Sequence, residues 1–201
     1  MCGQKVSNLS FRSVSLKDFN QAISYAEKFH KGQVRKSLKK EPMISHCKNV
    51  GDILIKCGAN KATVNAGILH DTIEDTIVTK KDLAKSFGQK VSHLVNCVTE
   101  KANIDDWVKR SQAYISKLKK SPVDAMCVSA ADKIDNMCSI TENVAQKYNI
   151  FANMQGAPEM QLSKFEGVYN VVKGKIPKKL ENLYKETLDN FVKVLKENKY
   201  L

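Results

Sequence analysis

The sequence predicts an all-α protein that folds as one helical domain. Its 201 residues are 42% apolar and 27% charged, which is enough apolar side chain to bury a substantial core. It has only nine glycines and four prolines, few for a chain built on β-turns. Apolar residues also recur every three or four positions, as they do on one face of an α-helix. No internal repeat or domain boundary interrupts this pattern.

The chain is strongly basic, with a formal net charge of +12. This charge favours an anionic partner, although lysines on solvated helix faces give the same balance. The six cysteines form no C-x-x-C pair and no zinc-ribbon spacing. The N-terminus lacks the apolar core of a secretory signal, and no apolar run approaches the length of a membrane span. We therefore expect a reduced, cytoplasmic protein with no membrane segment.

Residues 1–14 are polar and without pattern, and we expect a flexible N-terminus there. The folded domain is expected to cover residues 15–201. Ser15 can cap its first helix, and Asp18 complements the helix dipole. The apolar residues that follow at helical spacing are Phe19, Ala22, Ile23, Ala26 and Phe29.

A basic loop comes next, with Gly32 as its break. Its cationic residues are Lys31, Arg35, Lys36, Lys39 and Lys40. Arginine could donate two hydrogen bonds to a phosphate and lysine could add a point charge, but a solvated basic loop explains the same pattern. A second helix follows Pro42, with His46 near its start. A histidine there can be a cap, a core residue or a ligand.

The stretch from His70 to Thr76 carries the strongest chemical signal. If residues 61–75 are helical, Glu74, Asp71 and Asp75 lie at about 40°, 100° and 140° from His70, all on one side. An exposed acidic helix end beside a core histidine is the alternative. Three carboxylates within two turns repel one another, so we favour a site that holds a cation. Gly67, one turn earlier on this side, would let another segment come close.

Capping residues and apolar spacing predict six further helices. They are expected at residues 79–87, 91–99, 107–118, 128–137, 162–172 and from Pro177 to Val194, with a loop over 144–160. Thr79 and Asp82 form a capping box with aspartate in place of glutamate. The apolar stripe of the last helix predicts core packing, and a dimer face is the alternative.

A second chemical stretch lies within residues 128–137. Asp132, Asp135 and Asn136 are spaced to share one helix face, and small residues precede them. A carboxylate in such a helix needs a partner, because burying an unpaired charge is costly. From these residues alone, a metal ion and a lysine or arginine are equally good partners.

The set His46, His70-Asp71 and Asp132 resembles the metal-binding signature of HD-domain phosphohydrolases. More specific matches over residues 18–175 resemble the RelA/SpoT hydrolase domain, and the chain's length resembles the stand-alone, Mesh-type small alarmone hydrolases. These matches are His30-x-Gly32-Gln33-x-Arg35-Lys36, His70-Asp71-x-x-Glu74-Asp75-Thr76, Phe87-Gly88 with its following apolar spacing, Ala131-Asp132-Lys133-x-x-Asn136 and Val171-Val172-Lys173-Gly174.

The resemblance implies a role for each matching residue. His46, His70, Asp71 and Asp132 would bind one divalent metal, usually Mn²⁺, for which two imidazoles and two carboxylates are suitable ligands. Glu74 and Asp75 would position and deprotonate the attacking water. The residues implied to hold the nucleotide and its phosphates are Arg35, Lys36, Lys109, Arg110 and Asn136.

The sequence departs from the family pattern near the first histidine and on the 128–137 helix. Met43 stands where an aromatic residue is usual, Cys47 replaces a proline, and Asp135 stands where relatives often carry His or Tyr. Residues 38–40 also lengthen the basic loop slightly. These changes leave the metal ligands intact but affect base recognition.

The implied reaction is hydrolysis of the 3′-diphosphate of (p)ppGpp to GDP or GTP and pyrophosphate. An alternative keeps the metal site and changes the substrate, to the 2′-phosphate of NADPH or another nucleotide. A further alternative is a non-catalytic basic module that binds nucleic acid or a protein. We do not favour it, because such a module has no need of Glu74 and Asp75 beside a complete ligand set.

Overall fold

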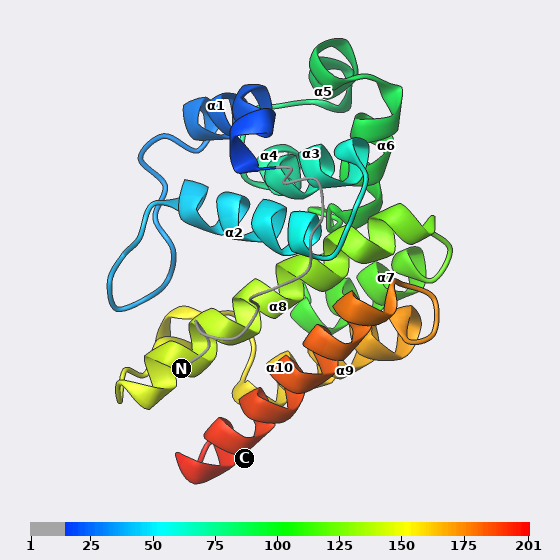
Figure 1. Cartoon of the computed structure of the whole chain (residues 1–201). Coiled ribbons are helices and arrows are strands. Elements are labelled where there is room, and N and C mark those ends of the chain that lie inside the picture. Colours follow the sequence, from blue (N-terminus) through cyan, green and yellow to red (C-terminus); the bar gives the residue numbers. More distant parts are fainter. Residues whose placement is uncertain (1–14) are drawn as a thin grey trace.

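The all-α prediction is confirmed by the structure, a computed structural model that describes residues 15–201 (Figure 1). The expected flexibility of residues 1–14 falls outside the described residues. Apart from an isolated bridge between Val34 and Pro42, the described elements are all helical. In chain order they are η1 (Leu16–Phe19), α1 (Asn20–Phe29), α2 (Met43–Lys56), α3 (Lys61–Leu69), α4 (Thr72–Asp75), α5 (Lys80–Phe87), α6 (Gln89–Val98), α7 (Trp107–Leu118), α8 (Val123–Ala145), η2 (Ile150–Asn153), α9 (Pro158–Val172) and α10 (Lys178–Glu197).

Local capping explains where several helices begin. Thr79 Oγ1 accepts from the backbone N–H of Asp82, and the Asp82 carboxylate accepts from the N–H of Thr79 at 2.9 Å. Ser15 and Asp18 form the same reciprocal pair at the start of η1. The box of Thr79 and Asp82 and the capping role of Ser15 were predicted from the sequence, whereas the hydrogen bond from the Ser15 N–H to Asp18 was not. Each pair satisfies backbone donors that a helix start leaves without partners.

Helix α8 is the centre of the fold and passes through the middle of the molecule (Figure 1). It packs against α2, α3 and α6, and against α9 and α10. Its small residues Ser129, Ala130 and Ala131 are fully buried, which allows the neighbouring helices to come close. Because α8 is covered on both faces, it carries core side chains and also side chains, such as Asp132, that were predicted to form the site.

The apolar stripe of α10 forms part of the core, as predicted. Phe191 meets Phe165 of α9 edge to face, with ring centroids 5.3 Å apart. Tyr184 is fully buried and donates its hydroxyl to the Phe165 carbonyl at 2.9 Å. This packing accounts for the stripe through contacts within the chain.

Gly67 allows the close approach of α2 and α3 that the sequence suggested. A Cβ at this position would collide with Leu54 Cδ1 and would lie 3.2 Å from Val50 Cγ1. Both of those α2 side chains are fully buried. The contact places the start of α2, which carries His46, beside the end of α3, where His70 lies.

The segment predicted as a loop over residues 144–160 contains more structure than expected. Helix α8 continues to Ala145, η2 interrupts the connection, and α9 already begins at Pro158. Proline is favoured in the first turn of a helix because its missing N–H has no partner to lose there. Apolar residues recur at helical spacing in α9 only from Leu162 onward. The predicted helix therefore began one turn after the observed one.

The described helices include none that is long and apolar enough to cross a membrane. Among the cysteines, Cys47 and Cys127 are buried in the core, and burial raises the pKa of each thiol to about 12. At neutral pH these thiols therefore behave as small apolar side chains.

Candidate active site and metal centre

The predicted continuous helix over residues 61–75 is wrong, because the chain turns at His70 and Asp71. Two carbonyls at the end of α3 are involved in side-chain hydrogen bonds. The Gly67 carbonyl accepts from His70 Nδ1 at 2.8 Å, and the Leu69 carbonyl accepts from Thr72 Oγ1 at 2.6 Å. Such bonds compete with the helical ladder, so α3 ends at Leu69 and the short helix α4 starts at Thr72.

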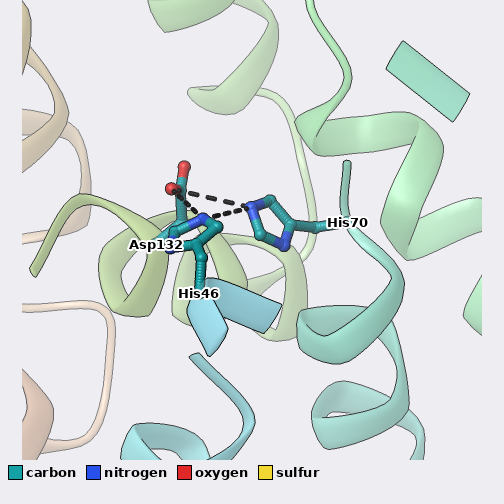
Figure 2. A group of neighbouring side chains, drawn as sticks. All are labelled: His46, His70 and Asp132. Atoms are coloured by element: carbon teal, nitrogen blue, oxygen red, sulfur yellow. Dashed lines mark hydrogen bonds and ion pairs between the residues drawn. The ribbon is translucent and has the colours of Figure 1, made fainter. Parts of the chain in front are cut away.

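This turn brings His70 toward His46 on α2 and Asp132 on α8 (Figure 2). Asp71 lies beside the two histidines. His46 Nε2 lies 3.1 Å from His70 Nε2 and 3.4 Å from Asp132 Oδ1. His70 Nε2 lies 3.1 Å from Asp71 Oδ1 and 3.6 Å from Asp132 Oδ1. The three residues drawn in Figure 2 could hold a metal ion, and the contacts of Asp71 add a fourth donor.

In His46 and His70, a hydrogen bond at Nδ1 leaves Nε2 as the nitrogen that can accept a hydrogen bond or bind a metal. His70 Nδ1 faces the carbonyl oxygen of Gly67, and His46 Nδ1 lies 2.6 Å from the carboxylate of Asp135. These oxygens accept only, so Nδ1 carries the hydrogen in each ring and the neutral ring's lone pair is on Nε2. When both rings are neutral, two imidazole lone pairs and two carboxylates face one another, and this arrangement binds either a metal ion or protons.

The spacing of these donors fits a small divalent ion. Ligand atoms bound at about 2.1 Å to one ion lie about 3.0–3.4 Å from their neighbours. The separations of 3.1 and 3.4 Å around His46 Nε2 fall in this range. The chemistry and the spacing of the donor set therefore both suit a metal ion.

The charges of the centre shift the pKa of each ligand. Although burial opposes the shift, the positive His70 lowers the pKa of Asp71 to about 2. Against the same opposing effect of burial, Lys133 and the two histidines hold the pKa of Asp132 well below its usual range. Burial alone would lower the pKa of His70, but Asp71 and Asp132 raise it well above its ordinary value. Without a metal, protons on the imidazoles balance the carboxylates.

A cavity of about 570 Å³ opens over this centre. All four donors line it, together with Glu74 and Asp75 from α4 and with Arg35, Lys36 and Asn136. Its apolar lining includes Val98, Ile140, Ile150 and Met154. The cavity thus joins a candidate metal centre, basic side chains and an apolar wall of a kind that suits a nucleobase.

Glu74 is held at the edge of the cavity by a backbone hydrogen bond. Its Oε2 accepts from the N–H of Glu100 at 2.8 Å. Removal from bulk water within the cavity walls and the negative charge of Asp71 raise the pKa of Glu74 to about 7. The same two causes raise the pKa of Asp75. A carboxyl group with a pKa near neutrality is suited to taking up a proton during a reaction.

The motif from His30 to Lys36 attaches the basic loop to α4. Gly32 has a φ of +82°, which favours glycine, and it turns the chain so that Gln33 Nε2 donates to the Asp75 carbonyl at 2.8 Å. The side-chain oxygen Oε1 of Gln33 in turn lies 2.6 Å from His30 Nδ1. The loop beside Arg35 is therefore fixed to the helix that carries the acidic pair.

The profile of the HD domain matches residues 22–156, two thirds of the chain. The chain belongs to the HD-domain family. It is 37% identical over 130 residues to a GTP pyrophosphokinase of Streptomyces coelicolor, a match that covers 61% of this chain and 15% of that protein. It is 32% identical over 127 residues to the Drosophila melanogaster guanosine-3′,5′-bis(diphosphate) 3′-pyrophosphohydrolase MESH1, covering 62% of this chain and 70% of MESH1.

The fold of this HD domain matches solved structures as well. One, described as a metazoan ortholog of SpoT that hydrolyses ppGpp, superposes with a TM-score of 0.72 at 25% identity, covering 96% of this chain and all of the other. The chain spans less than a fifth of the length of the first two curated relatives that it matches, because those proteins are much longer. The shared part is the HD domain.

Two of the residues that the resemblance implied for substrate binding do not line the cavity of this HD domain. Lys109 is exposed on α7. Arg110 donates to the Glu100 carboxylate at 3.1 Å and to Gln155 Oε1 at 2.6 Å, so its guanidinium is engaged beside the cavity. The structure brings together the other predicted site residues, namely Arg35, Lys36, His46, His70, Asp71, Glu74, Asp75, Asp132 and Asn136.

Sequence reasoning gave no role to Lys133, which the structure places in the cavity lining. Lys133 Nζ lies 2.6 Å from Asp132 Oδ2 and 5.1 Å from the centroid of the Tyr114 ring. Its ammonium also faces Glu100, and Glu100 is paired with the buried Lys164. Lys133 directly follows Asp132 in a helix with small residues, and that adjacency was the available signal.

Metal affinity should rise with pH. In the metal-free protein the raised pKa values of His46 and His70 keep protons on the ligands, and a metal must displace these protons. We expect Mn²⁺ to bind at least about tenfold more tightly at pH 8 than at pH 6. Thermal unfolding should show the same trend, with a larger metal-induced rise in Tm at pH 8. Equal affinity at the two pH values, measured by calorimetry, would contradict this ligand set.

Proposed function

We propose that the chain is a metal-dependent hydrolase of (p)ppGpp that removes the 3′-diphosphate and releases GDP or GTP and pyrophosphate, with Mn²⁺ as its metal. The observation that carries this proposal is the convergence of His46, His70, Asp71 and Asp132 in one cavity with Glu74 and Asp75. Two imidazoles and two carboxylates suit Mn²⁺. The functions described for MESH1 and for the SpoT ortholog support the choice of substrate.

The residues of the cavity have distinct tasks in the proposed reaction. A divalent ion held by the four ligands supplies Lewis-acid polarisation of a phosphoryl oxygen. Glu74 accepts a proton from the attacking water, whose oxygen bonds to the phosphorus attached to the ribose 3′ oxygen. The bond between that phosphorus and the 3′ oxygen breaks, the 3′ oxygen takes a proton from solvent as it leaves, and Glu74 returns its proton to solvent. Asp75 holds the water in line for attack.

The remaining lining residues are proposed to hold the nucleotide. Lys36 is exposed and lines the cavity, so it can meet a phosphate as a free ammonium. Arg35 and Asn136 lie together, with Arg35 Nη2 donating to Asn136 Oδ1 at 3.1 Å. Met154, Ile150 and Ile140 offer apolar surface for the base. We propose that residues 15–201 act as one hydrolase domain in the cytoplasm, and that Lys109 and Arg110 contribute to the charge near the distal phosphates from outside the cavity.

The deciding experiment offers ppGpp, pppGpp and NADPH separately to metal-loaded protein, with Mn²⁺ and with chelator. Release of pyrophosphate from the guanosine nucleotides that depends on Mn²⁺ is the expected result. If orthophosphate is released from NADPH and neither guanosine nucleotide is hydrolysed, NADPH becomes the proposed substrate and the proposed metal site is kept. Turnover that continues unchanged with chelator would overturn the metal-dependent mechanism. If the protein instead binds nucleic acid with an affinity that falls as salt is added and does not change with chelator, it is a binding module.

A further inference from the structure

Asp135 lies on the side of His46 that faces away from the metal ligands. Its Oδ2 is 2.6 Å from His46 Nδ1, whereas His46 Nε2 faces His70 and Asp132. The two nitrogens point in different directions from the imidazole ring, so Asp135 is not one of the converging donors. Its side chain is only 10% exposed and is surrounded by polar partners.

Three donors converge on this one carboxylate. Besides His46, Asn49 Nδ2 donates to Oδ1 at 2.8 Å, and Arg35 Nη1 forms a short ion pair with Oδ2. Asn49 lies on α2, and Arg35 lies in the basic loop, 100 residues away in the sequence. The carboxylate therefore joins α8, α2 and the basic loop at a single point.

The contacts form a closed path back to the metal centre. Arg35 Nη2 donates to Asn136 Oδ1 at 3.1 Å, and Asn136 Nδ2 donates to Asp132 Oδ1 at 2.5 Å. Two of the four metal ligands, His46 and Asp132, are thus oriented by residues that also hold Arg35. The orientation of the ligands and the position of the substrate-binding loop depend on the same carboxylate.

We propose that Asp135 is a positioning residue that acts through His46. It keeps the hydrogen on Nδ1, aims the Nε2 lone pair at the metal, and adds negative charge that makes the imidazole a stronger ligand. It also anchors Arg35, so that the basic loop is already in place when a nucleotide enters. This inference depends on the proposed metal centre but not on the identity of the nucleotide.

Two substitutions separate the hydrogen bond of Asp135 from its charge. In Asp135→Asn, the amide oxygen can still accept from His46 and Arg35, and the amide NH₂ can face Asn49, whose own amide can flip to accept. Only the charge is lost, and we expect Mn²⁺ affinity to fall about tenfold. Asp135→Ala removes the acceptor as well, and we expect a loss approaching 100-fold. Mn²⁺ binding is measured without substrate by the EPR signal of the free ion.

Matched variants make the test specific. Glu142→Gln changes an exposed carboxylate on the same helix and should bind Mn²⁺ as the wild type does. Arg35→Met removes the other charged partner of Asp135 and should change Mn²⁺ affinity by less than about twofold, because His46 keeps its acceptor. A larger loss in Arg35→Met than in Asp135→Asn would show that the carboxylate serves the loop and not the histidine, and would overturn the proposal.

The nitrogen NMR signals of His46 provide a second readout. In Zn²⁺-loaded protein we expect a protected Nδ1–H signal in the wild type and in Asp135→Asn, and its loss to solvent exchange in Asp135→Ala. Unchanged affinity and an unchanged signal in both folded variants would refute the role of Asp135. If the protein does not hydrolyse ppGpp but the Mn²⁺ affinities change as expected, the proposed substrate is wrong and the positioning role of Asp135 is still supported.

Discussion

Asp71→Ala is expected to remove metal binding and hydrolysis together. Asp71 supplies a carboxylate 3.1 Å from His70 Nε2, and its loss leaves three donors around the centre. Because Lewis-acid stabilisation contributes several kcal/mol to the barrier, the rate should fall by about a thousandfold or more. Calorimetry with Mn²⁺ and a pyrophosphate-release assay measure the two losses on the same preparation.

Asp132→Ala should cause the same losses and an additional one. Asp132 is the ion-pair partner of Lys133, whose side chain is 10% exposed, so the substitution removes that pair and leaves the ammonium facing only Glu100 and the Tyr114 ring. Breaking a buried ion pair from one side costs about 3–5 kcal/mol. Measured in chelator, the free energy of unfolding should therefore fall far more for Asp132→Ala than for Asp71→Ala. Asp189→Ala removes an exposed carboxylate of α10 and is the control for both. Normal turnover in either site variant would exclude that residue as a ligand.

Glu74→Gln is expected to keep the metal and lose turnover. The glutamine oxygen can still accept from the Glu100 N–H, so the local geometry is preserved while the proton acceptor is removed. General-base catalysis contributes about 10²–10⁴ to a rate, and kcat should fall by that factor with Mn²⁺ affinity nearly unchanged.

The matched control for Glu74→Gln is Glu166→Gln, an identical change at an exposed position of α9. A near-normal kcat in Glu74→Gln would transfer the role of base to another group, with Asp75 next to be tested. A combined loss of kcat and Mn²⁺ affinity would instead mean that Glu74 helps to hold the ion.

Local signals explain why much of the fold was predictable. The capping box of Thr79 and Asp82 and the apolar stripe of α10 depend on residues within one or a few turns, and the structure contains both. Gly67 was predicted to permit a close approach, and α2 lies against it. Where propensity, capping and periodicity agree, the local sequence determines the element.

The remaining features depend on contacts that a linear pattern does not contain. The break at His70 results from a side chain bonding to the Gly67 carbonyl within an otherwise helical stretch. The ion pair of Arg35 with Asp135 joins residues 100 positions apart, and the hydrogen bond from Arg110 to Gln155 joins residues 45 positions apart. A charged residue near a site in sequence order is therefore a weak guide to whether its side chain enters the site.

Part of the wall proposed to hold the nucleotide lies on different segments of the chain from the proposed metal ligands. His46 and Asp132 belong to the long helices α2 and α8, which share buried core residues and cannot move without disrupting the fold. Lys36 and Met154 lie instead on connecting segments that pack less extensively. Under the proposed function, substitutions in those segments would change the nucleotide that binds while the proposed metal ligands stayed constant. An ancestral enzyme of this kind could give rise to descendants with different substrates by changing only its loops.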